Sequence, residues 1–356
     1  MRRTAWFIMY VLLTACVDPI SFTSPNAQPQ VVVDGMITDE PGPYTVALSF
    51  TRSLDIDALS DSPLEGAQIT IRSDAGESED LVPTNQPGVY QTTSIQGVAG
   101  RSYSILIRVR NKVYESLPEK LPGVGQIDAI NYKFRQLSEG KNSATGQFNI
   151  SVDGRAASVG ENYLRWRIIG TYKVENFPQY NTTFEDGERV PDPPPCSGYL
   201  PKSTIKAGPC SCCTCWVTQY GTPQVTETKF TSDGTFRGIQ IGTVPVNRRT
   251  FYEKYHVEAE QLSLTQNAYN FWKLLQAQRE GGSSLFQPPL AQAKGNIFNQ
   301  ADEREIVQGY FTAAGVRRKS LFLSVNDIPI VLAPIDTLTI SCIGGNSSTT
   351  KPVFWK

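Results

Sequence analysis

The chain has 356 residues, a length typical of two domains rather than one or four. Its 33 basic and 34 acidic residues give a formal net charge of −1, whereas binding to duplex nucleic acid requires a basic surface. Hydrophobic residues make up 40% of the chain, which is enough to form a core, and the single histidine excludes metal sites built from several histidines. The composition therefore predicts a folded protein of two domains that does not bind nucleic acid.

The first residues have the pattern of a bacterial lipoprotein signal. Arg2 and Arg3 precede an uncharged apolar run that ends at Ala15. A bilayer-spanning helix needs ~20 apolar residues, so this run is too short to be one and fits a secretion signal. It ends in Leu-Thr-Ala-Cys16, which resembles a lipobox, where signal peptidase II cleaves before a cysteine that carries diacylglycerol. We therefore expect residues 1–15 to be removed and Cys16 to be lipidated, with an ordinary secretion signal as the alternative.

Residues 16–29 are rich in Pro, Ser, Asn and Gln and lack periodicity, so they predict a flexible tether. Two or three acyl chains, diacylglycerol and palmitate among them, hold a protein to a membrane much better than one chain. We therefore expect the protein to be anchored to a membrane by lipid. Asp18 resembles the acidic export signals of Bacteroidota surface lipoproteins, which leaves a position on the cell surface open.

Residues 30–122 predict an immunoglobulin-like β-sandwich. Runs that alternate apolar and polar residues, such as Tyr44–Phe50 and Tyr103–Val109, are separated by turns rich in Gly and Pro. Period-two runs spaced about ten residues apart are typical of antiparallel sandwiches. Tyr103 is either a tyrosine that caps a sheet corner or an ordinary core residue.

Residues 123–356 predict a second β-rich domain with one amphipathic helix, so the whole fold class is mainly β. Ser263-Leu264-Thr265-Gln266 has the pattern of a capping box that begins a helix over about 264–279. Its apolar stripe is expected to pack on a sheet, with a ligand-facing groove as the alternative. The expected strands are Ala129–Phe134, Gln147–Val152, Tyr163–Val174, Phe236–Val244, Phe251–Val257 and Ser320–Val325.

A poorly patterned insertion, about 176–235, holds most of the cysteines. If Cys16 carries lipid, six cysteines remain, and an even number outside the cytoplasm predicts disulfides of undetermined connectivity. Adjacent Cys212 and Cys213 are expected to pair with different partners. A thiolate metal site and a redox-active motif are the alternatives. The disulfide candidates are Cys196, Cys210, Cys212, Cys213, Cys215 and Cys342.

No motif of the sequence predicts a catalytic centre, a metal site or a cofactor. His256 lies in a strand-like run and is interpreted as structural, because no nucleophile elbow accompanies it. The segment 123–125 lacks the third glycine of a phosphate-binding loop. Asp55, Asp57 and Asp61 are interpreted as a solvated loop rather than calcium ligands, because the glycine and glutamate of an EF-hand are absent.

Several stretches together resemble the domain-of-unknown-function 4249 lipoproteins of Bacteroidota, and the resemblance covers nearly the whole chain. It implies an outer-membrane lipoprotein that is often encoded beside a TonB-dependent receptor, and it carries no catalytic residues across. The dense cysteine cluster is not matched to the family pattern. The matching stretches are 16–20, 31–44, 87–90, 97–103, 113–116, 271–275, 295–297 and 309–311.

We therefore expect a non-enzymatic outer-membrane lipoprotein that docks on a TonB-dependent transporter or delivers ligand to it. Two other classes stay open. One is an extracytoplasmic hydrolase that uses paired carboxylates, as glycoside hydrolases do. The other is a structural or adhesive envelope protein, for which an exposed apolar patch would be typical.

Overall fold

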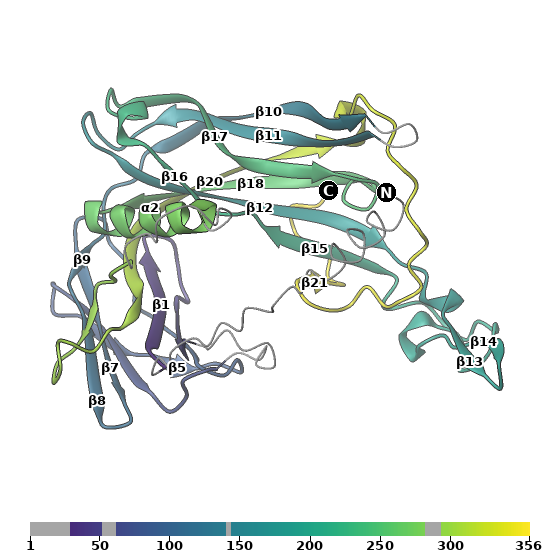
Figure 1. Cartoon of the computed structure of the whole chain (residues 1–356), viewed down its shortest axis with the longest axis horizontal. Helices are drawn as coiled ribbons and strands as arrows, with labels where there is room; N and C mark the ends of the chain where they lie inside the picture. Colours follow the sequence, from purple (N-terminus) through teal and green to yellow (C-terminus); the bar gives the residue numbers. More distant parts are fainter. Residues whose placement is uncertain (1–28, 52–61, 140–143, 282–292) are drawn as a thin grey trace, which may run out of the picture.

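The computed structural model describes residues 29–51, 62–139, 144–281 and 293–356 (Figure 1). It confirms the predicted fold class, because an N-terminal β-sandwich is followed by a second β-rich domain that carries one helix. The predicted signal peptide, Cys16 and the residues Asp55, Asp57 and Asp61 lie outside the described residues. Within the described part of the chain, no helix combines the length and apolar character needed to span a bilayer.

The first sandwich packs two sheets against each other, and alternate residues of both sheets point into its core, as the period of two requires. One sheet contains β1 (Val31–Thr38), β2 (Thr45–Phe50), β6 (Val89–Gln91) and β5 (Val82–Pro83). The facing sheet contains β19 (Ile297–Asn299), β8 (Lys112–Ser116), β7 (Ser102–Val109), β3 (Gln68–Ser73) and β4 (Ser78–Asp80), with β9 (Glu119–Lys120) beside β7.

Tyr103 caps a corner of this sandwich. Its ring is 1% exposed, and its hydroxyl accepts a hydrogen bond from the Val98 N–H at 2.8 Å. A tyrosine hydroxyl bound to backbone a few residues upstream is typical of the tyrosine corner of sandwich folds. The corner interpretation is therefore confirmed, and the ring also belongs to the core.

Part of the first sandwich comes from the far end of the chain, outside the predicted range 30–122. Strand β20 (Gln308–Ser324) pairs in parallel with β1 from Gln308 to Ala314, and β19 pairs with β8. Phe311 of β20 is fully buried in the first core. The predicted boundary at 122 therefore does not enclose the whole sandwich, because a local pattern cannot show which distant strand completes a sheet.

The second half of β20 turns to the second sandwich, where it pairs antiparallel with β18 (Lys254–Leu264) from Gly315 onward. A single ten-stranded sheet therefore runs through both sandwiches, with β1 and β18 on either side of β20. The predicted strand Ser320–Val325 is only the end of this long element.

The second sandwich packs the rest of that sheet against three further strands (Figure 1). The large sheet contributes β12 (Tyr163–Glu175), β15 (Thr214–Tyr220), β16 (Gln224–Thr226), β18, β20 and β21 (Ser347–Ser348). The facing sheet contains β10 (Gln126–Glu139), β11 (Ala144–Arg155) and β17 (Thr235–Val246). The predicted strand Phe251–Val257 begins late, at Lys254, because Asn247 binds the backbone N–H groups of Arg249 and Thr250 in a turn.

Helix α2 (Gln266–Gly281) confirms the predicted helix but begins two residues later. Ser263 is not its cap, because β18 continues through Leu264 and pairs there with β12. The Thr265 hydroxyl accepts the Ala268 N–H at 3.2 Å and caps the helix instead. Ala268, Tyr269 and Phe271 are buried against the sheet, which confirms that the apolar stripe forms core.

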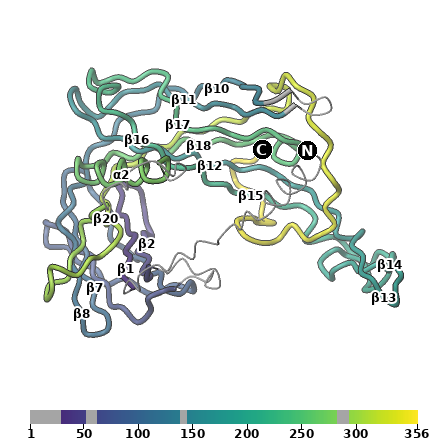
Figure 2. Tube along the Cα trace, viewed as in Figure 1, coloured from purple at the N-terminus to yellow at the C-terminus, as the bar shows by residue number. Residues whose placement is uncertain are grey.

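The predicted cysteine-rich insertion is partly regular. Its end supplies β15 and β16 to the large sheet, and these two strands were not predicted from the sequence. Its first part forms a hairpin that extends away from the sandwiches (Figures 1 and 2). The remaining elements are β13 (Thr182–Glu185), β14 (Glu188–Pro191), η1 (Pro178–Tyr180), η2 (Pro195–Ser197), η3 (Thr228–Phe230) and η4 (Val325–Asp327).

An ion network around the buried Glu260 joins strands of the large sheet between the two sandwiches. Glu260 is 1% exposed and lies between Arg167 at 2.7 Å and Arg318 at 2.5 Å. Arg318 also pairs with Glu40 after β1, and Arg317 pairs with Asp39 at 3.0 Å. A buried carboxylate is stable only when it is paired and hydrogen-bonded. The network thus links strand β20 to elements of both sandwiches.

Candidate interaction surface

The six cysteines of the body form three disulfides, which confirms the main prediction for them. Cys196 pairs with Cys212, Cys210 with Cys213, and Cys215 with Cys342. Adjacent Cys212 and Cys213 have different partners, as expected. Disulfide sulfurs cannot act as thiolate ligands, and the described residues contain no group of three or more His, Cys, Asp or Glu placed to hold a metal.

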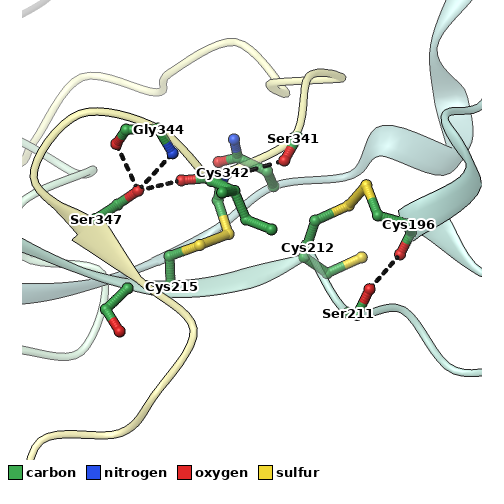
Figure 3. The surroundings of a disulfide bond; sticks show 12 residues. Cys196, Ser211, Cys212, Cys215, Ser341, Cys342, Gly344 and Ser347 are labelled. Carbon is green, nitrogen blue, oxygen red and sulfur yellow. Dashed lines mark hydrogen bonds between the residues drawn. A yellow bond between two sulfur atoms is a disulfide. The ribbon is translucent and has the colours of Figure 1, made fainter. Parts of the chain in front are cut away.

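The disulfides lie where the insertion meets the sheet. Figure 3 shows Cys212 and Cys215 close together at the start of β15, each bonded to a different part of the chain. The Cys342 N–H donates to the Cys212 carbonyl at 3.0 Å, which brings the C-terminal segment against the same strand. The base of the insertion is therefore fixed to β15 and to the C-terminal segment together.

Two further contacts attach the insertion to the C-terminal segment. The Phe177 N–H donates to the Leu338 carbonyl at 2.7 Å. The buried Asn176 side chain donates to the Ile340 carbonyl at 3.0 Å. The Cys215–Cys342 disulfide joins residues that are 127 positions apart in the chain. In the chain-entropy model, a disulfide that closes a loop of this length stabilises the fold by about 5 kcal/mol.

The insertion displays apolar side chains to solvent. We call residues 177–211 the stapled projection, because two of its cysteines, Cys196 and Cys210, form disulfides with Cys212 and Cys213 directly after it. None of its side chains belongs to the three core clusters. Its exposed apolar residues, with exposed fractions, are Phe177 37%, Tyr180 64%, Phe184 72%, Leu200 45% and Ile205 62%.

Three exposed aromatic residues of the stapled projection are held by contacts with neighbouring side chains. The rings of Phe177 and Tyr180 are stacked, with 6.3 Å between centroids and 20° between planes. The Arg189 guanidinium lies over the Phe184 ring at 5.9 Å. The Lys202 ammonium pairs with Glu185 of the hairpin. Aromatic rings and arginine in an exposed, held position are typical of protein–protein contact sites.

A cavity of about 220 Å³ opens at the base of the projection, between Phe177, Tyr252 and Leu338. Glu175 at its wall accepts a hydrogen bond from the Tyr252 hydroxyl at 2.6 Å and pairs with Lys173 at 3.1 Å. These contacts hold the pKa of Glu175 below its usual range, so the carboxylate is ionised and already compensated. The apolar side of the cavity continues the aromatic surface of the projection.

His256 is structural, as the sequence suggested. The ring is 3% exposed and stacks on Phe354 with 4.0 Å between centroids, next to Phe322 at 5.0 Å. Burial lowers its pKa to about 4, so the imidazole is neutral at physiological pH. A buried imidazole among aromatic rings cannot receive a proton from a substrate in solvent.

The sequence correctly predicted that the cysteines form disulfides. It did not identify the side chains that the stapled projection exposes to solvent. Tyr180 and Phe184 lie in a stretch without apolar periodicity, close to several prolines. Aromatic residues outside any periodic run are not part of a predicted core. Their position in such a stretch was the feature of the sequence that could have identified them as exposed.

These features together define a protein of two β-sandwiches, joined by one continuous sheet, with a disulfide-stapled surface projection. The chain belongs to the family described as Domain of unknown function (DUF4249), whose sequence model matches residues 17–320. The match ends before Cys342, so the long-range disulfide reaches outside the matched range.

A search of curated proteins finds no match to this chain. Among solved structures it matches a two-domain fibronectin type III segment of chicken tenascin. That segment is 14% identical, and the match covers 67% of this chain and 92% of the segment with a TM-score of 0.17. A similarity of this size carries no conclusion about function.

Proposed function

We propose that this protein is a lipid-anchored accessory protein of the outer membrane, which docks on a TonB-dependent transporter through the stapled projection and contributes to ligand delivery without catalysis. The projection is the observation that supports the proposal. It displays apolar side chains on a segment that has no core of its own and that disulfides keep in place. Such a surface is typical of a contact site, because single-chain proteins rarely leave aromatic residues gathered in solvent.

Rigidity favours docking by the projection. A flexible loop loses conformational entropy when it binds, whereas a segment that is already held in its bound shape loses little. Both the Cys196–Cys212 and Cys210–Cys213 disulfides constrain the projection before any partner arrives.

The position of the projection is also favourable. Strand β1, which follows the predicted tether, lies in the first sandwich, and the projection extends from the opposite end of the second sandwich (Figure 1). A protein anchored at its N-terminus would therefore present the projection away from its point of attachment.

Co-purification from the native bacterium in mild detergent tests the docking. We expect the tagged wild-type protein to recover a β-barrel transporter, and the double variant Tyr180→Ser/Phe184→Ser to lose it. The matched control is Val159→Ser, which removes an apolar side chain that is at least as exposed (79%) and lies between β11 and β12, outside the projection. Recovery of no transporter by the wild type, or equal recovery by the double variant, would contradict the proposal.

The lipid anchor needs its own test, because Cys16 lies outside the described residues. Mass spectrometry of the purified mature protein should show an acylated N-terminal cysteine at position 16. Cys16→Ser should abolish the acylation and release the protein from the membrane fraction. A mature chain that retains residues 1–15, or that carries no acyl chain, would refute the anchoring.

A further inference from the structure

We infer that the polar cavity at the open edge of the second sandwich is a binding site for a neutral oligosaccharide. The cavity has a volume of about 650 Å³, within the range of roughly 300–1,000 Å³ that is usual for ligand sites. It lies where the end of β15 and the start of β16, on one sheet, face β17 of the other sheet, and the last turn of α2 closes one side. These elements are labelled in Figure 1.

The side chains at this cavity carry hydrogen-bonding groups that nothing in the described chain uses. Gln219, Thr222, Gln240 and Thr243 line it, and no hydrogen bond joins any of these side chains to another described residue. An amide and a hydroxyl each donate and accept hydrogen bonds. A sugar ring presents neighbouring hydroxyls that also do both, so such a lining matches it without any charge.

Tyr220 adds an aromatic surface to these polar groups. Its side chain is 56% exposed, and the Arg167 guanidinium lies over the ring at 5.2 Å from the centroid. Arg167 is itself held by Glu260 at 2.7 Å. The ring is thus supported by a fixed neighbour while more than half of the side chain stays open. The C–H face of a sugar ring packs favourably on an exposed aromatic ring, because it is apolar like the ring face.

The cavity floor is formed by buried aliphatic residues and a glycine. Ile168 and Ile241 are buried, and a Cβ at Gly242 would lie 2.8 Å from Ile168 Cδ1. Any larger residue at 242 would therefore displace Ile168 or fill the cavity. The depth of the cavity therefore depends on the glycine at position 242. The cavity is open in this structure without the movement of any segment.

The charges at the rim favour a neutral ligand over an ionic one. Arg279 and Glu280, one of each sign, are the charged residues that line the cavity, and their formal charges cancel. Each already has a contact, because Arg279 donates to the Pro223 carbonyl at 3.2 Å and Gln276 donates to Glu280 at 3.0 Å. A site for an anion would instead present unpaired cationic donors.

The strand edge at this cavity is unsuited to binding an extended peptide. Pro245 has no backbone N–H to donate, and the pairing of β17 with β11 shifts register between Gly242 and Gln240. A peptide added to a sheet edge needs a regular ladder of backbone donors and acceptors. The side-chain amides and the tyrosine ring are therefore the main recognition groups.

This inference goes beyond the proposed docking and does not depend on it. The test uses the detergent-solubilised full chain on an array of oligosaccharides of glucose, xylose, mannose, galactose and N-acetylglucosamine, with acidic oligosaccharides and extended peptides included. Titration calorimetry then measures the affinity for the neutral oligosaccharide that binds best. We expect binding to at least one neutral oligosaccharide.

Variants show whether that binding occurs at this cavity. Tyr220→Ala should weaken binding by roughly tenfold, equivalent to ~1.4 kcal/mol, and Gln240→Ala should weaken it severalfold. The control Tyr180→Ala removes an exposed tyrosine of the stapled projection and should not change sugar binding, and circular dichroism confirms that each variant is folded. Binding to no neutral oligosaccharide, preference for acidic oligosaccharides or peptides, or an unchanged affinity in Tyr220→Ala would overturn the inference. Loss of transporter recovery in the Tyr180→Ser/Phe184→Ser variant tests only the proposed docking. Failure of the docking proposal can therefore be distinguished from failure of the oligosaccharide inference.

Discussion

At the scale of single residues, two short glycine-containing motifs close the first sandwich. The buried Asn296 accepts the Phe311 N–H at 2.9 Å and donates to the Phe311 carbonyl at 2.8 Å. Gly309 has φ +91°, which favours glycine, and a Cβ there would lie 1.9 Å from the Val33 carbonyl oxygen. A Cβ at Gly295 would lie 1.8 Å from the Gly309 carbonyl oxygen. The stretches 295–297 and 309–311, noticed in the sequence only as a resemblance, thus have a packing role.

Removing the Asn296 side chain should destabilise the first sandwich. Asn296→Ala leaves a buried N–H and a buried carbonyl of Phe311 without these partners, and we expect a loss of about 3 kcal/mol in the free energy of unfolding. Urea denaturation measures it. Asn270→Ala, at an exposed position of α2, is the control and should change stability by less than about 0.5 kcal/mol. Equal midpoints for Asn296→Ala and the wild type would refute this role.

His256 should make stability depend on pH. Its pKa is lowered to about 4 in the folded protein, from 6.5 for the free side chain. Between these values the unfolded chain binds a proton that the folded protein does not bind, so stability falls as pH decreases from 6.5 to 4. The shift corresponds to a loss of up to about 3 kcal/mol.

The variant His256→Phe isolates this effect. Glu119 and Glu258 have raised pKa values through burial and act in the opposite direction, but they are present in both proteins. We therefore expect the stability difference between wild type and variant to change between pH 6.5 and pH 4, with the variant gaining relative to the wild type. A constant difference across this range would show that His256 is not buried in its neutral form.

At the scale of elements, the sequence predicted the helices and strands that have a clear apolar periodicity. It did not predict the features that depend on pairing between strands far apart in the chain. Helix α2 was expected from its apolar stripe, but its start moved because Ser263 pairs in β18 rather than capping the helix. Strand β15 was not predicted, because the cysteines at and before its start dominated the interpretation of this stretch. The stretch also alternates, since Cys215 is buried whereas Thr214 and Trp216 are only partly buried. Disulfide formation was predicted from the even number of cysteines and the expected compartment, whereas the connectivity depends on which strands become neighbours.

The three disulfides should differ in their contribution to stability. In the chain-entropy account the contribution rises with the separation of the joined residues, which is 127 for Cys215–Cys342, 16 for Cys196–Cys212 and 3 for Cys210–Cys213. The expected losses on removal are about 5, 3 and 1.6 kcal/mol. Thermal unfolding of the three double Cys→Ser variants measures the order.

A thiol titration of the denatured, unreduced protein controls this experiment. Cys196, Cys210, Cys212, Cys213, Cys215 and Cys342 should give no free thiol. Free thiols at these positions in protein isolated from the native envelope, or a greater loss for the Cys210/Cys213 variant than for the Cys215/Cys342 variant, would contradict the account.

At the scale of the whole molecule, the two sandwiches are not independent units joined by a linker. Strand β20 pairs with β1 in one half and with β18 in the other, and the ion pair between Arg318 and the buried Glu260 lies beside this connection. The sequence predicted two domains, but only the long-range pairing shows that the first sandwich needs the C-terminal part of the chain.

A fragment that ends at the predicted boundary should therefore fail to fold. Residues 30–122 lack β19 and the first half of β20, whose Ile297, Phe311 and Ala313 are buried in the first core. We expect this fragment to show no cooperative thermal transition by circular dichroism. A fragment that carries residues 293–316 behind a glycine–serine linker should regain one, and a cooperative transition in the shorter fragment would show that β20 is dispensable.

We propose that the protein contacts a transporter in the outer membrane through the stapled projection. Site-specific photocrosslinking in the native bacterium tests this contact most directly, with a photoreactive amino acid placed at Phe184 and, as the control, at Val159, which is slightly more exposed. The account predicts a crosslink from position 184 to a TonB-dependent transporter and none from position 159. A transporter crosslink from position 159 but not from 184, or no transporter crosslink from position 184, would contradict it.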